Sequence, residues 1–93
     1  MNGVVSSSTE EQPRKPSAIA RMVGLERAAE LLGKGGQGEV ADALGISNRA
    51  LRYKTDGRSG VGNGDLTMTA ALLDRRARQL NEHARKLREE AGQ

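Results

Sequence analysis

Four polar side chains, spaced by one helical turn, are the residues of this sequence best suited to bonding with another macromolecule. They are Asn48, Arg49, Arg52 and Tyr53. Positions 48 and 52, and positions 49 and 53, are four apart, so within a helix all four would lie on one exposed face. A guanidinium can donate two parallel hydrogen bonds to guanine, and an amide can bond in the same way to adenine. The spacing therefore predicts a helix that contacts the edges of DNA bases.

Four further polar residues flank this group, and we expect them to contact phosphates: Gln37, Ser47, Lys54 and Arg58. The local charge agrees, because Arg49, Arg52, Lys54 and Arg58 fall within ten residues and are opposed only by Asp56. The net charge of the whole chain is +3. That balance suits a polyanionic partner but decides little alone, and the placement of the charge is the stronger indication.

Other chemistry finds little support in the residue types. The chain has no Cys and a single His, His83, so one chain cannot assemble a zinc site of the usual kind. Ser6, Ser7 and Ser8 have no nearby His to act as a base. The run GKGGQG at residues 33–38 matches G-x-G-x-x-G, but helical sequence precedes it and a dinucleotide site needs a strand there. We therefore expect no enzyme activity, no metal and no cofactor.

Two short helices joined by a tight turn are predicted to position the polar group. The first covers residues 37–44, with Val40, Ala41 and Leu44 on one face. Gly45 follows at once, where helices commonly end in a left-handed residue. Ser47 is a good N-cap for the second helix, residues 48–55, whose apolar Leu51 faces away from the polar group.

This stretch resembles helix-turn-helix transcriptional regulators. The resemblance rests on Gln37, the pair Val40–Ala41, the run Leu44–Gly45–Ile46, and Leu51. The segment ALGISNRALRYK is most similar to helix-turn-helix motifs of the Fis type. The surrounding arrangement is more similar to small Cro- and lambda-repressor-like proteins. Lys54 departs from the repressor pattern, which usually has an apolar residue there. The resemblance implies a small, cytoplasmic, nucleoid-associated regulator without a ligand-binding domain.

The flanking segments complete a head of about three helices. Residues 1–16 are rich in Ser, Thr and Pro and are predicted to be a disordered tail. An amphipathic helix over residues 17–32 begins at Ser17 as N-cap, and Gly24 marks either its true start or a close contact. Four glycines in residues 56–64 predict a loop.

A long helix is predicted from Asp65, as N-cap, to about residue 90. Its Leu residues 66, 73, 80 and 87 recur every seven positions, with Ala70, Ala77 and Ala84 four after each of the first three. This is the seam of a coiled coil, with Ala at a and Leu at d. A helix this long extends beyond a small head, so we expect self-dimerisation through Leu73, Ala77, Leu80, Ala84 and Leu87. Both parallel and antiparallel pairing stay open, and so does a helix folded over its own head.

The sequence thus predicts an all-α protein with three parts: a tail at 1–16, a DNA-binding domain at 17–64 and a dimerisation helix at 65–93. The function expected from these parts is a sequence-specific, repressor-like homodimer on pseudo-palindromic double-stranded DNA. Two alternatives remain, an architectural DNA binder and a protein–protein adaptor built on the same fold. Neither a membrane segment nor a small-molecule ligand is expected.

Overall fold

A computed structural model describes residues 14–92 of the chain. Within that range it consists of four helices and no strand: α2 (Arg14–Leu32), α3 (Gly36–Leu44), α4 (Asn48–Thr55) and α5 (Asn63–Ala91). The prediction of an all-α fold with a long last helix is confirmed. The tail predicted at 1–16 lies mostly outside the described residues. No described helix is both long enough and apolar enough to cross a membrane.

Helix α2 begins at Arg14, three residues earlier than predicted. Pro16 does not delay the start, because its missing N–H falls in the first turn, where backbone N–H groups have no partner within the helix. Residues 14–16 therefore belong to α2 and not to the tail, and Ser17 is not its N-cap. Gly24 marks neither a helix start nor a close contact, since a Cβ there would have no atom within 4 Å.

The core is small and aliphatic, and it lies where α2, α3, α4 and α5 meet. Its buried members are Leu25, Ala29, Leu32, Val40, Ala41, Leu51 and Leu72. Small residues let the helices approach closely: a Cβ on Gly36 would collide with the carbonyl group of Ala29. The first turn of α3 is thereby packed directly on the backbone of α2.

The turn between α3 and α4 has the predicted chemistry. Gly45 has φ 72°, in the left-handed region. Its N–H donates to Asp42 O at 3.1 Å, and the N–H of Ile46 donates to Ala41 O at 3.0 Å, so the two bonds form a Schellman motif. Ser47 Oγ then accepts the N–H of Ala50 at 3.0 Å and caps α4. The two helix boundaries at this turn match the prediction.

Helix α5 begins at Asn63, two residues before the predicted start, with Gly62 as its N-cap. Asp65 is thus the third residue of the helix and not its N-cap. Its Oδ2 accepts the backbone N–H of Gly62 at 2.9 Å. A carboxylate three residues into a helix can satisfy the free N–H of the N-cap residue, which explains the shift.

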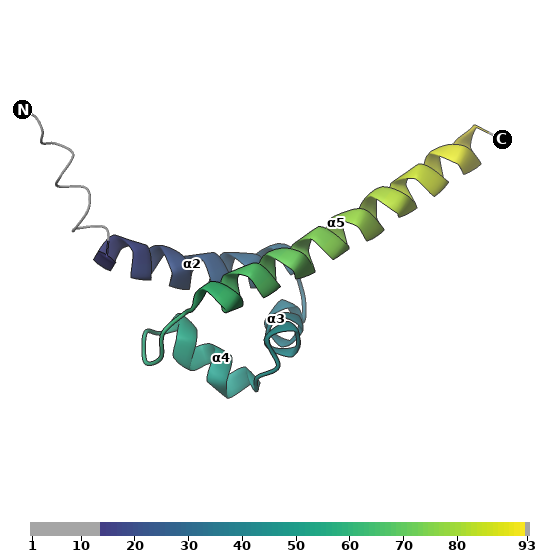
Figure 1. The fold of residues 1–93 in the computed structure, drawn as a ribbon. Helices are drawn as coiled ribbons and strands as arrows, with labels where there is room; N and C mark the ends of the chain where they lie inside the picture. The colour runs from purple at the N-terminus through teal and green to yellow at the C-terminus, as the bar shows by residue number, and fades with distance from the viewer. Residues whose placement is uncertain (1–13, 93) are drawn as a thin grey trace, which may run out of the picture.

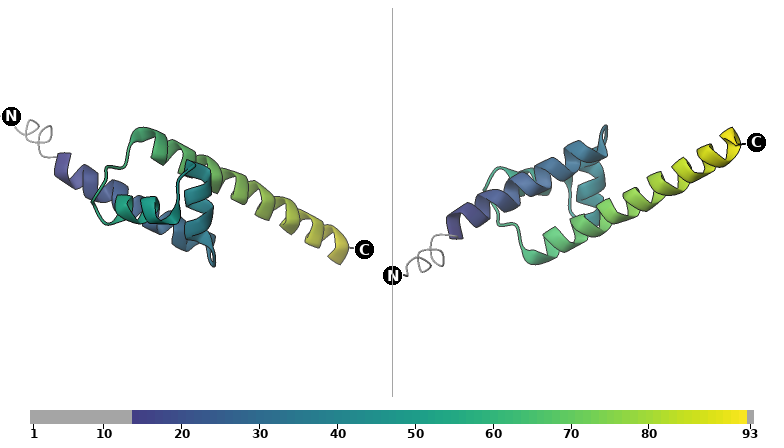
Figure 2. Two further views of the ribbon diagram at one scale, coloured as in Figure 1. Left: turned by 90° about the horizontal axis from the view of Figure 1, so that it is seen from below. Right: turned by 90° about the horizontal axis from the view of Figure 1, so that it is seen from above.

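Helices α2 and α5 form one layer of the molecule, and α3 and α4 lie beneath them (Figure 1). The C-terminal half of α5 leaves this bundle and projects on the side away from α4, and both views in Figure 2 show it extending past the other helices. The longest principal dimension is 64 Å. We call residues 14–76 the head and residues 77–91 the overhang.

Candidate nucleic-acid interface

Helix α4 has one buried face and one exposed polar face. Leu51 is 4% exposed and belongs to the core. Asn48, Arg49 and Arg52 are exposed, and Tyr53 is 37% exposed. Among the described residues, neither Arg49 nor Arg52 has an ion-pair partner. Their charges are therefore available to a ligand, and burial of Leu51 fixes the direction in which they point.

An open hollow lies over this face. Five side chains line it: Arg49, Arg52, Tyr53, Asp56 and Arg58. Three of the five are arginines, so the hollow combines positive charge with the flat ring of a tyrosine. Such a surface suits a phosphate or the edge of a base, since guanidinium groups bond to both.

Arg58 is held in place by its neighbours in the loop after α4. Its guanidinium carbon lies 5.0 Å from the centre of the Tyr53 ring, and its Nε lies 3.3 Å from Asp56 Oδ2. The backbone N–H of Arg58 also donates to Tyr53 O and to Asp56 Oδ1. Asp56 was not among the predicted site residues. The signal in the sequence was an Asp two positions before the Arg, since Asp side chains commonly bond to the backbone two residues on.

Lys54, predicted to contact phosphate, uses its charge inside the chain. Its Nζ lies 3.0 Å from Asp65 Oδ2 and donates to Gly60 O at 2.9 Å, and its side chain is only 19% exposed. This arrangement accounts for a Lys where the resemblance expects an apolar residue, because the half-buried charge is neutralised locally. Lys54 links α4 to the start of α5 and is poorly placed for phosphate.

The ion pair between Lys54 and Asp65 also affects the pKa of the Asp65 carboxyl group. Burial on its own would raise the pKa of Asp65, but the bonds from the Gly62 N–H and the Lys54 ammonium outweigh it. The pKa of Asp65 is therefore lowered from its ordinary value of 3.8. The ionised carboxylate is the form that this corner of the head stabilises.

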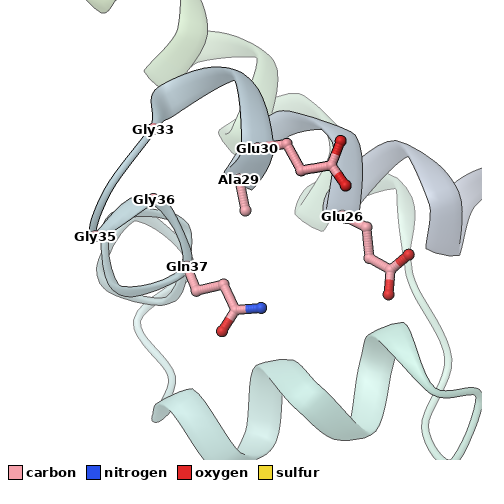
Figure 3. A pocket seen from close by; sticks show the side chains of 7 residues that line it. All are labelled: Glu26, Ala29, Glu30, Gly33, Gly35, Gly36 and Gln37. Atoms are coloured by element: carbon pink, nitrogen blue, oxygen red, sulfur yellow. The ribbon is translucent and has the colours of Figure 1, made fainter.

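Gln37 and Ser47, the other predicted phosphate contacts, do not line the arginine hollow. Gln37 is exposed at the start of α3, where it lines a second hollow with Glu26 and Glu30 of α2 (Figure 3). Two carboxylates make that hollow unfavourable for an anion. Ser47 is exposed beside Asn48, and its hydroxyl accepts the capping bond from Ala50.

The glycine-rich stretch at residues 33–38 joins two helices. It follows the end of α2 and runs into α3, and Gly33 and Gly35 both have positive φ. A dinucleotide fingerprint requires a strand before its glycines, and a helix stands there instead. The interpretation of this stretch as a helix exit and linker agrees with the observed backbone.

The five residues predicted for dimerisation fall into two groups. Leu73 is half-buried and packs against the core of its own head. Ala77, Leu80 and Leu87 are exposed, at 63% and 57% for the two leucines, and Ala84 is half-buried on the overhang. The structure therefore leaves four of the five uncovered by the head.

The described residues contain no group of three or more His, Cys, Asp or Glu side chains that could hold a metal ion. What the exposed face of α4 offers is hydrogen-bond donors and positive charge, without a base–nucleophile pair. Comparison with protein-family models, with curated proteins and with solved structures found no match for this chain. Its function must therefore be inferred from its own residues.

Proposed function

We propose that this protein is a sequence-specific DNA-binding regulator of the helix-turn-helix type that acts as a cytoplasmic homodimer. One observation carries the proposal: α4 buries Leu51 and presents Asn48, Arg49 and Arg52 outward, with no intrachain ion pair on either arginine among residues 18–92. A helix of this kind fits the major groove, which is wide enough to admit it.

Five polar residues of α4 and the loop after it then contact DNA. Asn48, Arg49 and Arg52 read base edges, and Tyr53 contacts a thymine methyl or a phosphate. Arg58, stacked on Tyr53 and held by Asp56, contacts a phosphate next to the bases read by α4.

The predicted phosphate contacts are not equally well placed for that role. Ser47 stands close to Asn48 at the start of α4. Gln37 lies near two carboxylates, which would repel a phosphate. The charge of Lys54 is already paired with Asp65. We assign Lys54 to the stability of the head, so its replacement should change the free energy of unfolding and not the salt dependence of DNA binding.

The decisive experiment selects bound sequences from a random duplex pool and then measures affinity for selected and random DNA at fixed salt. We expect Arg49→Ala and Arg52→Ala each to cost about 1–3 kcal/mol on the selected site and to relax preference at one base pair. Arg58→Ala should weaken binding to both kinds of DNA and flatten the salt dependence. Arg75→Ala, on the outer side of α5, is the matched control and should change neither.

The outcomes separate the proposal from its alternatives. Equal losses on selected and random DNA would remove Arg49 and Arg52 from base readout and favour an architectural binder. No binding to any duplex at low salt would contradict the proposal and would favour the protein–protein adaptor instead. A selected motif with two-fold symmetry is the result that the proposal requires.

A further inference from the structure

The Leu/Ala seam of α5 changes environment at the edge of the head. Its first leucines, Leu66 and Leu73, are half-buried against the core, whereas Leu80 and Leu87 are exposed at 63% and 57%. The same helical face thus continues past the head with nothing to cover it among the described residues. We propose that a second copy of this chain covers it in antiparallel orientation, with residues 77–87 of each copy paired. The proposal rests on the homodimer proposed above and specifies its geometry.

Burial by the head argues against the parallel alternative. In a parallel pair each seam residue faces its own equivalent, so Leu73 would face the partner's Leu73. Leu66 and Leu73 are already packed against the core of their own head, which occupies that side of α5. Two parallel helices would have to diverge before Leu73, and their heads would crowd the same end of the seam.

An antiparallel pair avoids this conflict. When Ala77 faces the partner's Leu87, Leu80 faces the partner's Ala84, and the remaining two layers follow by symmetry. All four layers then use residues outside the head, and each helix ends its pairing where the other head begins. The exposed part of the seam is therefore just long enough for this register.

Side-chain volume favours the same arrangement. In antiparallel coiled coils an a position faces a d position, so every layer here would pair one Ala with one Leu. A parallel pair would alternate layers of two Ala with layers of two Leu. Pairing large with small residues across an interface keeps the separation of the helices constant and avoids voids.

The charges beside the seam give an independent indication. In the antiparallel register Asp74 lies next to the partner's Arg88, and by symmetry this opposite-charge pair forms twice. Asp74 and Arg88 are both exposed and make no ion pair within the described chain. In a parallel pair, Asp74 would neighbour the partner's Thr69 and Arg88 the partner's His83, which supplies no opposite charge.

The second charged pair of the antiparallel register joins Arg76 to the partner's Glu90. Arg76 already bonds to Glu39 within the head, so this guanidinium would be shared between two carboxylates. Asn81 and His83 would lie beside their own equivalents close to the two-fold axis. Neither position carries a carboxylate or a guanidinium, so no Arg–Arg or Glu–Glu pair forms at the centre of the interface.

This geometry places the two heads at opposite ends of the paired helices. Thr69, buried where α5 crosses the head, would be ~39 Å from the partner's Thr69 along the helices at ~1.5 Å per residue. Helix α4 lies beneath α5 and not on this line (Figure 1), so the value describes the separation of the two heads and not the spacing of the half-sites.

Disulfide trapping tests the orientation without DNA, because the chain has no natural Cys. The full-length variants Ala77→Cys and Leu87→Cys are mixed, equilibrated at high concentration in a thiol–disulfide buffer, and separated by mass. We expect the disulfide that joins one variant to the other to exceed the two self-linked products combined, because random pairing of equal amounts would give as much of it as of those two together. Predominant self-linking of each variant would show a parallel pair and overturn the proposal, as would the absence of any cross-link.

A charge exchange tests the register in a chain whose seam is intact. Asp74→Arg and Arg88→Asp, made singly, should each weaken dimerisation roughly threefold to tenfold in sedimentation, and the double variant should restore it. Arg75→Asp, on the outer side of α5, is the control. Additive losses in the double variant would overturn the register. Because no step involves DNA, a failure of DNA binding would leave these results interpretable on their own.

Discussion

The two halves of α5 carry the same seven-residue repeat in different surroundings. In the head, Leu72 and Thr69 are buried and Leu66 and Leu73 are half-buried against the core. In the overhang, no residue is buried, and Leu80 is 63% exposed. One unbroken helix therefore serves as part of a core over one half and as a free surface over the other.

The difference teaches that a repeat marks an apolar face but does not say what covers it. The head buries a face that includes Thr69 and Leu72, neither of which belongs to the Leu/Ala seam. The seam lies beside that face, so in the head only its leucines are partly covered and Ala70 stays exposed. Burial is decided by the neighbouring helices, and the repeat is used fully only where those neighbours are absent.

Truncation of one leucine in each half of α5 should reveal the largest difference in stability between the two halves. Leu72→Ala removes a core side chain and should lower the free energy of unfolding by about 2–4 kcal/mol. Leu80→Ala should change it by less than about 0.5 kcal/mol in dilute solution, because the side chain is exposed in the monomer. Chemical denaturation at two protein concentrations measures both. Similar losses for the two variants in dilute solution would show that the halves are equally buried.

Acid should weaken the half-buried ion pair between Lys54 and Asp65 in the head. The folded-state pKa of Asp65 is lowered, so its contribution to stability is full above the ordinary value of 3.8 and is lost as the pH falls towards the folded pKa. Asp65→Asn should cost ~1–2 kcal/mol at neutral pH, and the difference from the natural chain should shrink below about pH 4. Thermal or urea unfolding across pH 2–7 checks this. A difference that does not change with pH would show that the carboxylate charge contributes nothing.

The buried hydroxyl of Thr69 provides a smaller test within the head. Thr69 is 4% exposed, and its Oγ1 has no hydrogen-bond partner. Thr69→Val keeps the shape and removes the unpaired group, so it should stabilise the head by about 1 kcal/mol. Thr67 is the matched control, because it is exposed and its hydroxyl bonds to Asn63 O. A loss of stability in Thr69→Val would indicate that the hydroxyl has a partner in solution.

The smallest effect is expected for the surface pairs of the overhang. Arg85 bridges Glu82 and Glu89 at 2.8 and 2.9 Å, but all three side chains are more than half exposed. Arg85→Ala should therefore lower helicity slightly and cost no more than about 0.5 kcal/mol, less so at high salt. Circular dichroism at low and high salt measures the change. A loss as large as that of Asp65→Asn would remove the contrast between exposed and half-buried ion pairs.

Local chemistry made much of the fold predictable. The end of α3 at Gly45, the capping of α4 by Ser47 and the inward direction of Leu51 all follow from residues within one turn of each other. The starts of α2 and α5 differ from the prediction by three and two residues, because Pro16 and Asp65 each fit more than one position in a first helical turn. The arginine-rich face of α4 was predictable from spacing alone.

The partners of individual charges were not predictable. Lys54 and Asp65 are eleven positions apart and meet only because the loop after α4 brings α5 back beside it. Arg76 and Glu39, on α5 and α3, meet in the same way across the head. The resemblance marked position 54 as one that is usually apolar, but nothing in the local pattern identified Asp65 as the partner of Lys54.

The sequence by itself determined the helices, the turn at Gly45 and the polar face of α4, because caps and periodicity act over a few neighbouring residues. Only the tertiary structure decided which charges remain available and where α5 stops being covered. Those outcomes depend on contacts between residues distant along the chain, and each such contact removes a side chain from solvent or leaves it there.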